Sequence, residues 1–573
     1  DIQHWETYEP APYGYPDPRN LPTQERLLAQ QLEPYVQQPG ATDPVVNAAA
    51  KYVYLHLADL LSFFSAPKFL NPDEALAQLD LTTSCGPFVP GRKSDYISLV
   101  DGRAHYDPAT PFGVHIQNTM AVATTGCPIE NAYQLALKDE LLPHPKCHQK
   151  KRLIWGTDVG LTFLAQMVWG DIMVKLKNLN FVSPVAVGCN PHSSFTLALA
   201  DRFYGKQTLC LDYRKWDSTM HPNVIHLAVD ILCDLGQQGL LTESLRKTLK
   251  QNPIGYFMDK KVVALRGLPS GTPGTSILNS ICHCIFFVSA LWLAQDNAGI
   301  ARDVDPFRCN SIVTYGDDCI YGFSARNAAL LADFITSLRV LGLFPTSVAK
   351  DQNYVLNGPL VFLRRTWQTL DIPNIGQIIV APLDIDSILR QALWVKGSKT
   401  LPHTATKNST QDRQNQLQEA LMELAIHGQQ LFEEKKTILL TAASAEGFRL
   451  VDDWYILVEQ YYHRWKIGDP SCNTTLGAIL SGSLQNPPER QQQNTQPEQN
   501  QQTTGLTGTE TASGLLTGSY TATPAVAGTA GAPVPASESL AALGAGVQTG
   551  VPPQLYGLWV SNQKFTWNSQ QPV

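Results

Sequence analysis

The chain has 573 residues, more than one ordinary domain, and 43% of them are hydrophobic, which is enough apolar material for a substantial core. A formal net charge of −7 excludes a globally basic nucleic-acid binder, so a nucleic-acid partner would have to be held by local basic clusters. Eleven scattered cysteines without a CxxC pair predict reduced thiols of a cytosolic compartment rather than a disulfide framework.

The first part of the chain predicts an arm followed by a globular body. Residues 1–50 are rich in proline and polar groups and predict an extended arm that packs over another part of the protein. From about Asp43 to Leu457 apolar periodicity is sustained, and helical patterns alternate irregularly with strand-like runs. This mixture predicts an α+β protein with an antiparallel sheet. The ends, Asp1 and Val573, are interpreted as cuts from a longer chain.

A basic run follows in a stretch with few strand signals. It includes Lys138, Lys151 and Arg152. The planar guanidinium of Arg152 and the lysine charges could neutralise an incoming triphosphate. The alternative is a solvated charged loop.

Four aspartates carry the strongest chemical signal. Asp212 ends a strand-like run, and Asp217 follows five residues later, before a predicted helix. Further on, two β-prone runs flank Gly316, Asp317 and Asp318, a composition that favours a tight hairpin turn. Adjacent acids on a turn repel each other unless a cation lies between them, so a magnesium site is predicted. The alternative is a solvated turn.

The segment Gly267–Ser280 reads as a Gly/Pro loop that runs into a long helix. Thr275 and Asn279 are four residues apart and share one helix face, and Ser270 lies on the loop before them. Hydroxyl and amide groups on one face suit recognition of a ribose 2′-hydroxyl, which is both donor and acceptor. The alternative is a helix cap with a buried asparagine.

The same helix continues into the longest apolar stretch, Ile281–Ala294. This stretch is interrupted by His283 and is too short to span a bilayer, so no transmembrane segment is predicted. Cys282 and Cys284 flank His283, but core packing is the preferred interpretation over zinc ligation.

Two further basic positions follow the turn. Arg364 and Arg365 lie in a strand-like run and could position phosphate, although protective charge on an edge strand is an equal alternative. Lys350 lies in a loop with few anchoring residues.

The composition changes near Leu484. Residues 485–550 are dominated by Gln, Asn, Thr, Ser, Gly, Ala and Pro and are predicted to be disordered. Aromatic and aliphatic residues return in 551–573, which is interpreted as the beginning of another folded unit.

Taken in chain order, these segments resemble the motifs of positive-strand RNA virus polymerases. The matching segments are Thr82–Gly86, Lys138–Arg152, Asp212–Asp217, Ser270–Asn279, Tyr315–Asp318, Lys350 and Phe362–Arg365. The segments that resemble the calicivirus form most specifically are Lys151–Gly156, Asp212–Thr219, Gly267–Gly271 and Ser387–Gln391. The resemblance extends from about Trp5 to about Ile467.

The resemblance implies a closed right-hand polymerase of fingers, palm and thumb within residues 1–484, with palm motifs at about 205–367 and the thumb at about 368–470. It implies a three-stranded palm sheet and two Mg²⁺ or Mn²⁺ ions. The implied residue roles are metal binding by Asp212, Asp317 and Asp318, ribose recognition by Asp217, Ser270, Thr275 and Asn279, triphosphate contact by Lys138, Lys151 and Arg152, protonation of pyrophosphate by Lys350, and primer contact by Arg364 and Arg365.

The same resemblance implies partners and context. These are an RNA template and product, NTPs, a protein primer linked to the genome, a viral protease that processes the chain, and possible homo-oligomers at membrane-associated replication complexes in the host cytoplasm. Glu538–Gly550 and Phe565–Asn568 are similar to the amino-terminal arm of a calicivirus capsid protein of the sapovirus type. The chain is therefore expected to be a polyprotein fragment, with a protease junction between about Leu484 and Gly546.

Two rival functions are open at this level. Tyr315–Asp318 also fits a reverse transcriptase, although Asp217 and Asn279 offer hydrogen-bonding groups where deoxynucleotide enzymes typically place a bulky residue. The capsid-like tail allows a mainly structural capsid precursor.

Overall fold

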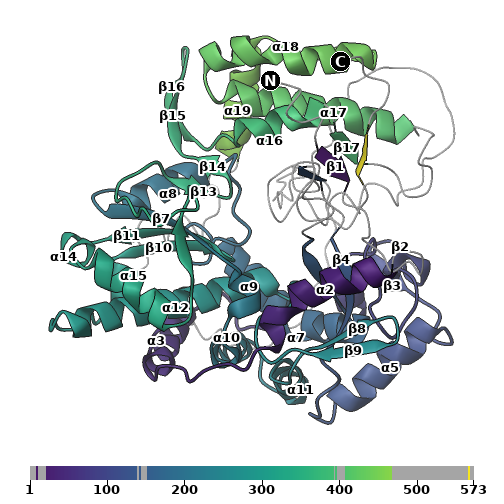
Figure 1. Cartoon of the computed structure of the whole chain (residues 1–573). Helices are drawn as coiled ribbons and strands as arrows, with labels where there is room; N and C mark the ends of the chain where they lie inside the picture. The colour runs from purple at the N-terminus through teal and green to yellow at the C-terminus, as the bar shows by residue number, and fades with distance from the viewer. Residues whose placement is uncertain are drawn as a thin grey trace, which may run out of the picture.

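The structure is a computed structural model of the chain, shown in Figure 1. It describes residues 8–10, 21–138, 141–143, 151–392, 394–396, 407–467 and 565–567. The predicted disordered segment at 485–550 lies outside the described residues. The predicted capsid segment at 551–573 also lies outside them, except for the short strand β18 (Phe565–Trp567).

An antiparallel sheet forms the middle of the protein. Its strands are β7 (Gln207–Tyr213), β10 (Ser311–Tyr315), β11 (Asp318–Phe323) and β12 (Pro345–Ser347). They lie in the order β10-β11-β7-β12, and every neighbouring pair is antiparallel. The predicted antiparallel sheet is confirmed, with four strands where the resemblance implied three.

One face of this sheet packs on a helical core. Alternate residues of β7, Leu209, Leu211 and Tyr213, are buried in that core, as expected for a strand with one covered face. The helices of this layer are α3 (Val45–Leu61), α10 (Pro222–Leu235), α12 (Thr275–Asn297) and α15 (Leu331–Val340).

Two helices are long and apolar enough to cross a membrane by length and composition, α7 (Val159–Asn178) and α12. In α7, 72% of the most apolar window is buried inside the protein, and in α12 the share is 94%. Their apolar composition is therefore accounted for by core packing. His283 is fully buried in α12, which agrees with its interpretation as a core residue.

A second four-stranded sheet lies beside the first (Figure 1). Its strands are β4 (Ala132–Leu137), β6 (Leu153–Thr157), β8 (Ile254–Phe257) and β9 (Lys260–Val263), in the order β6-β4-β8-β9. The β4–β8 pair is parallel, so the expectation of antiparallel pairing does not extend to this sheet. The helices of this part of the protein are α2 (Leu21–Val36), α4 (Pro72–Ala77), α5 (Pro111–Ala123), α7 and α11 (Leu240–Leu249).

The C-terminal helices have a hydrophobic core of their own and lie at the top of Figure 1. The unit contains β15 (Gln368–Ile372), β16 (Gly376–Val380), α16 (Ile385–Leu389), η3 (Arg390–Ala392), α17 (Lys407–Ala425), α18 (Gln429–Ala445) and α19 (Trp454–Ile467). A small hairpin, β13 (Val361–Phe362) and β14 (Arg365–Thr366), precedes it in the chain.

Short elements complete the fold. They are η2 (Lys93–Asp95), β2 (Ser98–Val100), β3 (Arg103–His105), α8 (Phe195–Phe203), α9 (Trp216–Thr219), α13 (Pro306–Cys309) and α14 (Ala325–Ala328). Two isolated strand pairs join β1 (Tyr8–Pro10) to β5 (Leu141–Pro143) and β17 (Trp394–Lys396) to β18.

Candidate active site

Asp212 lies near the end of β7 and points away from the helical core. The strand alternates, so Leu211 and Tyr213 enter the core while Asp212 shares the opposite face with Cys210. The Oδ1 atom of Asp212 accepts a hydrogen bond from the backbone N–H of Tyr213 at 2.8 Å. Its Oδ2 atom lies 3.7 Å from Nζ of Lys350, whose side chain is 76% exposed. Asp212 is therefore only partly buried and lies on the face of the sheet opposite the helical core, where it lines a cavity.

Gly316 and Asp317 form the two-residue turn between β10 and β11, because Tyr315 pairs with Asp318. Gly316 has a φ of +68°, whereas Asp317 is not among the residues with positive φ. This is the pattern of a type II′ hairpin turn, which places glycine first. A Cβ atom on Gly316 would meet nothing within 4 Å, so conformation and not space requires glycine here. The predicted tight turn is present.

Side chains of helix α12 hydrogen-bond to the backbone of the turn. The backbone N–H of Gly316 donates to Ser280 Oγ at 2.9 Å, and His283 Nδ1 lies 3.0 Å from the Gly316 carbonyl oxygen. His283 Nε2 lies 2.5 Å from the Tyr321 hydroxyl, which lies 2.6 Å from the Tyr213 hydroxyl. Burial lowers the pKa of His283 to about 4, so the imidazole is neutral at pH 7. It therefore donates to Gly316 through Nδ1 and accepts from Tyr321 through Nε2.

These contacts bring the three predicted metal-binding aspartates to one end of the sheet. Cys319 of β11 pairs with Leu211 of β7, so the next position along puts Asp318 opposite Asp212. Asp317 lies on the adjoining turn. All three line a cavity of about 660 Å³ together with Arg152, Lys350 and Arg364.

The ionisation of these carboxylates reflects their burial and their closeness to one another. Burial, followed by the neighbouring charges of Asp317 and Asp212, raises the pKa of Asp318 to about 7. The pKa of Asp317 is also raised, first by desolvation in the cavity and then by Asp212, although its backbone hydrogen bonds oppose the shift. A site that disfavours its own negative charges is stabilised by a bound cation, and carboxylate oxygens are the ligands that Mg²⁺ and Mn²⁺ prefer. The donor set therefore fits divalent ions.

A complete metal cage is not preformed. Within the described ranges, no three acidic, histidine or cysteine side chains converge closely enough to hold an ion by themselves. Magnesium sites commonly use one or two carboxylates and complete their coordination with water and substrate phosphates. The open carboxylate cluster is consistent with that mode of binding.

Asp217 and Asn279 meet beside this cluster. Asn279 Nδ2 donates to Asp217 Oδ1 at 3.0 Å, and Trp216 Nε1 donates to Asn279 Oδ1 at 3.1 Å. Burial and then the charge of Asp317 raise the pKa of Asp217 to about 7. The Asn279 side chain is buried, as the alternative of a helix cap with a buried asparagine expected. It also contacts Asp217, the carboxylate that was predicted to recognise the ribose.

The other two predicted ribose contacts are engaged with the backbone. Thr275 Oγ1 donates to the Thr272 carbonyl oxygen, and the Trp155 N–H donates to Ser270 Oγ at 3.3 Å. The loop itself lies close to β6, because a Cβ atom on Gly271 would come within 1.8 Å of the Trp155 carbonyl oxygen. Ser270 and Thr275 thus take part in the local hydrogen bonding of the loop and of the first turn of α12.

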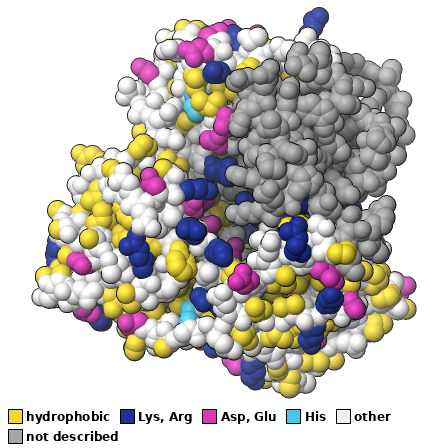
Figure 2. Space-filling model, viewed as in Figure 1, with side chains coloured by type: hydrophobic (Ala, Val, Ile, Leu, Met, Phe, Trp, Pro, Cys, Tyr) yellow, Lys and Arg dark blue, Asp and Glu magenta, His cyan; other side chains and the backbone are white. Residues whose placement is uncertain are grey.

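The basic residues divide in the same way. Arg152 and Lys350 line the cavity, whereas Lys138 and Lys151 are not among its lining residues. Lys151 is only 1% exposed, and the Lys138 N–H pairs with the Arg152 carbonyl oxygen at 2.8 Å. The prediction that Lys151 contacts triphosphate therefore does not agree with its burial. Figure 2 shows Lys and Arg side chains gathered near the centre of one face, among acidic side chains. The chain as a whole has a net charge of −7, so its basic side chains form a local cluster and not a generally basic surface.

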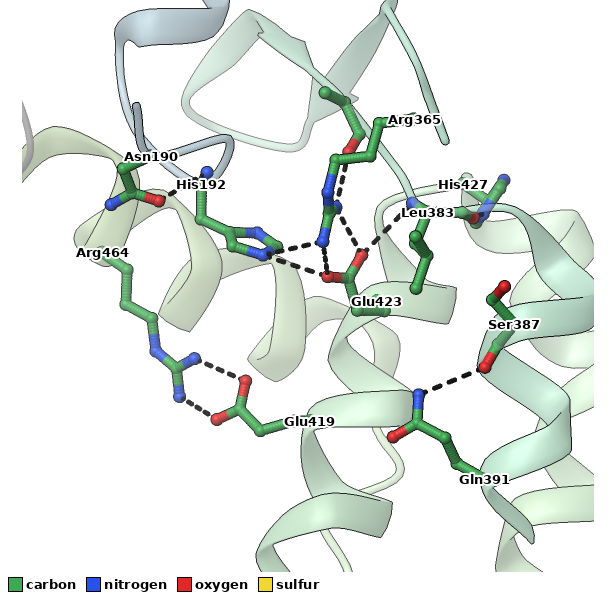
Figure 3. Close-up of polar contacts among 11 residues, drawn as sticks. Asn190, His192, Arg365, Leu383, Ser387, Gln391, Glu419, Glu423, His427 and Arg464 are labelled. Carbon is green, nitrogen blue, oxygen red and sulfur yellow. Dashed lines mark hydrogen bonds and ion pairs between the residues drawn. The ribbon is translucent and has the colours of Figure 1, made fainter. Parts of the chain in front are cut away.

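Arg364 and Arg365 point to different environments. Leu363 and Arg364 form the turn between β13 and β14 with φ values of 54° and 59°, a left-handed conformation that costs non-glycine residues about 1–2 kcal/mol each. Arg364 is exposed and lines the cavity. Arg365 is 4% exposed and donates to Glu423 at 2.6 and 3.0 Å (Figure 3). The prediction that Arg365 contacts RNA is corrected, because its guanidinium group is buried in this ion pair.

Several positioning residues could not be identified from the sequence. Ser280, His283 and Tyr321 support the turn, and Glu423 holds Arg365. A histidine within an apolar helix was the one visible signal among them. Glu423 lies in an ordinary amphipathic pattern and gave no signal.

Residues 1–443 match the family described as viral RNA-dependent RNA polymerase. The chain is 31% identical over 454 residues to the genome polyprotein of Canine calicivirus (strain 48) and 32% identical over 478 residues to that of Bovine enteric calicivirus Newbury agent-1. Each alignment covers 78% of this chain but only 23% and 20% of the two polyproteins, so the chain spans about a fifth of their length.

A solved structure with a similar fold is the Sicinivirus 3Dpol RNA dependent RNA polymerase. The TM-score is 0.61 at 19% sequence identity, and the match covers 80% of this chain and 92% of the other. At this identity the likeness concerns the fold.

Proposed function

This chain belongs to the viral RNA-dependent RNA polymerase family, and we propose that its carboxylate cavity performs nucleotidyl transfer with two divalent metal ions. The chain is an RNA-directed RNA polymerase of the α+β, right-hand class. The observation that carries the proposed site is the meeting of Asp212, Asp317 and Asp318 in one cavity, where burial and then the neighbouring carboxylates raise the pKa of Asp317 and of Asp318.

The proposed metal ligands are these three aspartates. When bound, Mg²⁺ or Mn²⁺ ions supply the positive charge that activates the 3′-hydroxyl of the growing RNA and stabilises the departing pyrophosphate. The chain's own contribution is to hold the carboxylates at fixed positions. The backbone of Gly316, bonded to Ser280 and His283, supports this role for the turn.

Substrate binding is assigned to the groups around the carboxylates. Asp217, held by Asn279, is the proposed reader of the ribose 2′-hydroxyl, since it lies close enough to Asp317 for the charge of Asp317 to raise its pKa. Arg152 is the proposed triphosphate contact, because guanidinium groups bind phosphate oxygens in a bidentate manner. Lys350 is the proposed donor of a proton to pyrophosphate, since it lies at the cavity wall beside Asp212.

The wider role follows from the relatives. We propose that the chain comes from a calicivirus-like polyprotein, is released by a viral protease, and copies a positive-strand RNA genome. A protein primer, assembly at host cytoplasmic membranes, homo-oligomers and a capsid-like segment after residue 484 are parts of the same proposal. The similarity of this chain to the genome polyproteins of two caliciviruses supports this origin.

Nucleotide selectivity provides the test of the function. Purified protein with Mn²⁺ or Mg²⁺ should extend an RNA primer on an RNA template with NTPs. The matched reaction contains the four dNTPs at the same concentrations. Extension with dNTPs at an equal or higher rate would favour the reverse transcriptase alternative, and absence of extension with either set would leave the capsid-precursor alternative.

A further inference from the structure

Arg365 is held by a buried carboxylate from a distant part of the chain. Its guanidinium nitrogens donate to Glu423 Oε1 at 2.6 Å and to Glu423 Oε2 at 3.0 Å, and one of them also donates to the Ala381 carbonyl oxygen at 2.8 Å. Glu423 lies on α17 and is 1% exposed. Burial opposes its ionisation, but Arg365 and His192 outweigh burial and hold the pKa of Glu423 well below its usual range.

Glu423 joins three segments of the cavity wall, as Figure 3 shows. The first segment is the hairpin that carries Arg365. The second is the loop before α8, where His192 Nε2 lies 3.0 Å from Glu423 Oε1. The backbone N–H of Leu383 donates to Glu423 Oε2 at 3.4 Å. Pro191, next to His192, and Leu383 both line the cavity that contains the catalytic aspartates. One carboxylate therefore fixes the positions of three parts of that wall.

The same contacts determine where Arg364 lies. Arg365 is paired with Leu383 by a β-bridge, and the Arg364 carbonyl oxygen accepts from the Asp384 N–H at 3.1 Å. The hairpin turn at Leu363 and Arg364 has positive φ at both residues. Such a conformation persists only where surrounding contacts over-determine it, and strained backbone of this kind is concentrated at functional sites. The buried ion pair supplies those contacts next to the turn.

We propose that Glu423 is a positioning residue for catalysis: its ion pair with Arg365 holds the hairpin so that Arg364 faces the carboxylate cluster and contacts a substrate phosphate. This inference rests on the proposed polymerase function. Arg364 lines the cavity beside Asp318, whose pKa its charge lowers. The phosphate belongs either to the incoming NTP or to the RNA backbone, since both offer the same anionic oxygens.

A double-mutant cycle tests this role. Glu423→Gln and Arg364→Ala are measured singly and together by RNA primer extension, with KM for NTP, kcat and the Kd for primer–template determined for each protein. Glu423→Gln should lower kcat/KM by about tenfold to a hundredfold, as a misplacement of about 1 Å can. In the Arg364→Ala background, Glu423→Gln should lower kcat/KM by less than about twofold, because the side chain that Glu423 positions is already absent.

Glu419→Gln is the matched control. Glu419 lies one turn earlier on α17 and is also held by an arginine, Arg464, at 2.8 and 2.9 Å, but it does not line the cavity (Figure 3). Glu419→Gln should change the rate of RNA extension by less than about twofold, both in the otherwise unmodified protein and in the Arg364→Ala variant. A rise in KM for NTP assigns the contacted phosphate to the nucleotide, and a rise in Kd for primer–template assigns it to RNA; either supports the proposal.

An equal loss from Glu423→Gln in the presence and absence of Arg364 would overturn the positioning role while leaving the polymerase function intact. Unmodified protein that fails to extend RNA would overturn the function and this inference with it. If Glu423→Gln does not fold, as judged by thermal melting, Arg365→Lys takes its place in the cycle. Arg365→Lys keeps the positive charge and loses the bidentate contact with Glu423. An equal loss in the presence and absence of Arg364 would then overturn the positioning role in the same way.

Discussion

The side-chain amide of Asn279 donates a hydrogen bond to the carboxylate of Asp217 across 3.0 Å, joining helix α12 to the short helix α9. The two residues are 62 positions apart in the chain. Trp216 donates to the other end of the same amide, so Asn279 is fixed at both its oxygen and its nitrogen. The carboxylate of Asp217 is thereby held in one orientation.

This pair predicts how the enzyme distinguishes NTPs from dNTPs. Asp217→Asn should lower the ratio of kcat/KM for NTP over dNTP by about tenfold, the amount expected for one lost hydrogen bond to the 2′-hydroxyl. Asp296→Asn, on helix α12 with Asn279 but at a surface ion pair with Arg302, is the control and should leave the ratio unchanged. A variant that is slower with both substrates at an unchanged ratio would show that Asp217 does not read the ribose.

The second prediction concerns pH and metal together. The pKa values of Asp217 and Asp318 are raised to about 7 in the metal-free protein, so between about pH 4 and pH 7 these two carboxyl groups bind more protons in the folded state than in the unfolded state. Their contribution to the stability of the metal-free protein should therefore fall as pH rises through that range, whereas His283, whose pKa is lowered, contributes with the opposite sign. Asp318→Asn removes one of the two carboxyl groups, so the difference in Tm between Asp318→Asn and the unmodified protein should shift in favour of the variant as pH rises from about 4 to about 7.

Mn²⁺ should reverse this trend, because it binds the deprotonated carboxylates. The rise in Tm on adding Mn²⁺ should be larger at about pH 8 than at about pH 6, where protons compete with the metal at Asp318. A rise in Tm that is equal at both pH values would count against metal binding by these groups.

The third prediction concerns the support beneath the turn. His283→Leu removes the donor to the Gly316 carbonyl oxygen, whereas Tyr321→Phe keeps that donor and removes only the hydroxyl on the other side of the imidazole. Each change leaves a buried polar group unsatisfied and should lower the free energy of unfolding by about 1–3 kcal/mol. Only His283→Leu should also lower the extension rate and the affinity for Mn²⁺, by about tenfold.

Chemical denaturation and Mn²⁺ titration of both variants separate these effects. Tyr321→Phe is the matched control for lost stability without loss of the turn contact. Equal effects of the two variants on extension would mean that His283 acts on overall stability alone.

The sequence was informative where the chemistry is local. The hairpin turn at Gly316 and the strand that carries Asp212 follow from β-prone runs and turn residues that are contiguous in the chain, and both are present. The long helix that carries Thr275 and Asn279 was correctly predicted, but their spacing on it could not show that the Thr275 hydroxyl donates to the Thr272 carbonyl oxygen. Hydroxyl groups in the first turn of a helix often bond to nearby backbone, so their spacing alone does not make them substrate contacts.

Contacts between distant segments lay beyond what the sequence could predict. Arg364 and Arg365 are adjacent in the chain, yet the β-hairpin sends one to the cavity and the other to Glu423, 58 residues away. Nothing in the local pattern distinguishes the two, because the distinction depends on which side chain meets a buried carboxylate. The same holds for Lys151 and Arg152, of which one is buried and the other lines the cavity.

The most direct test of the carboxylate site is the rate of RNA primer extension by Asp318→Asn, compared with that of the unmodified protein and of Asp296→Asn. The substitution keeps the size of the side chain and removes a charge that the cavity disfavours, so the protein should remain folded, with a Tm at least equal to that of the unmodified protein in the absence of metal. Extension by Asp318→Asn should fall by about a thousandfold or more, since an interaction made in the transition state is lost. Extension within about tenfold of the unmodified rate by the folded variant would contradict the assignment of Asp318 and its neighbours as the catalytic carboxylates.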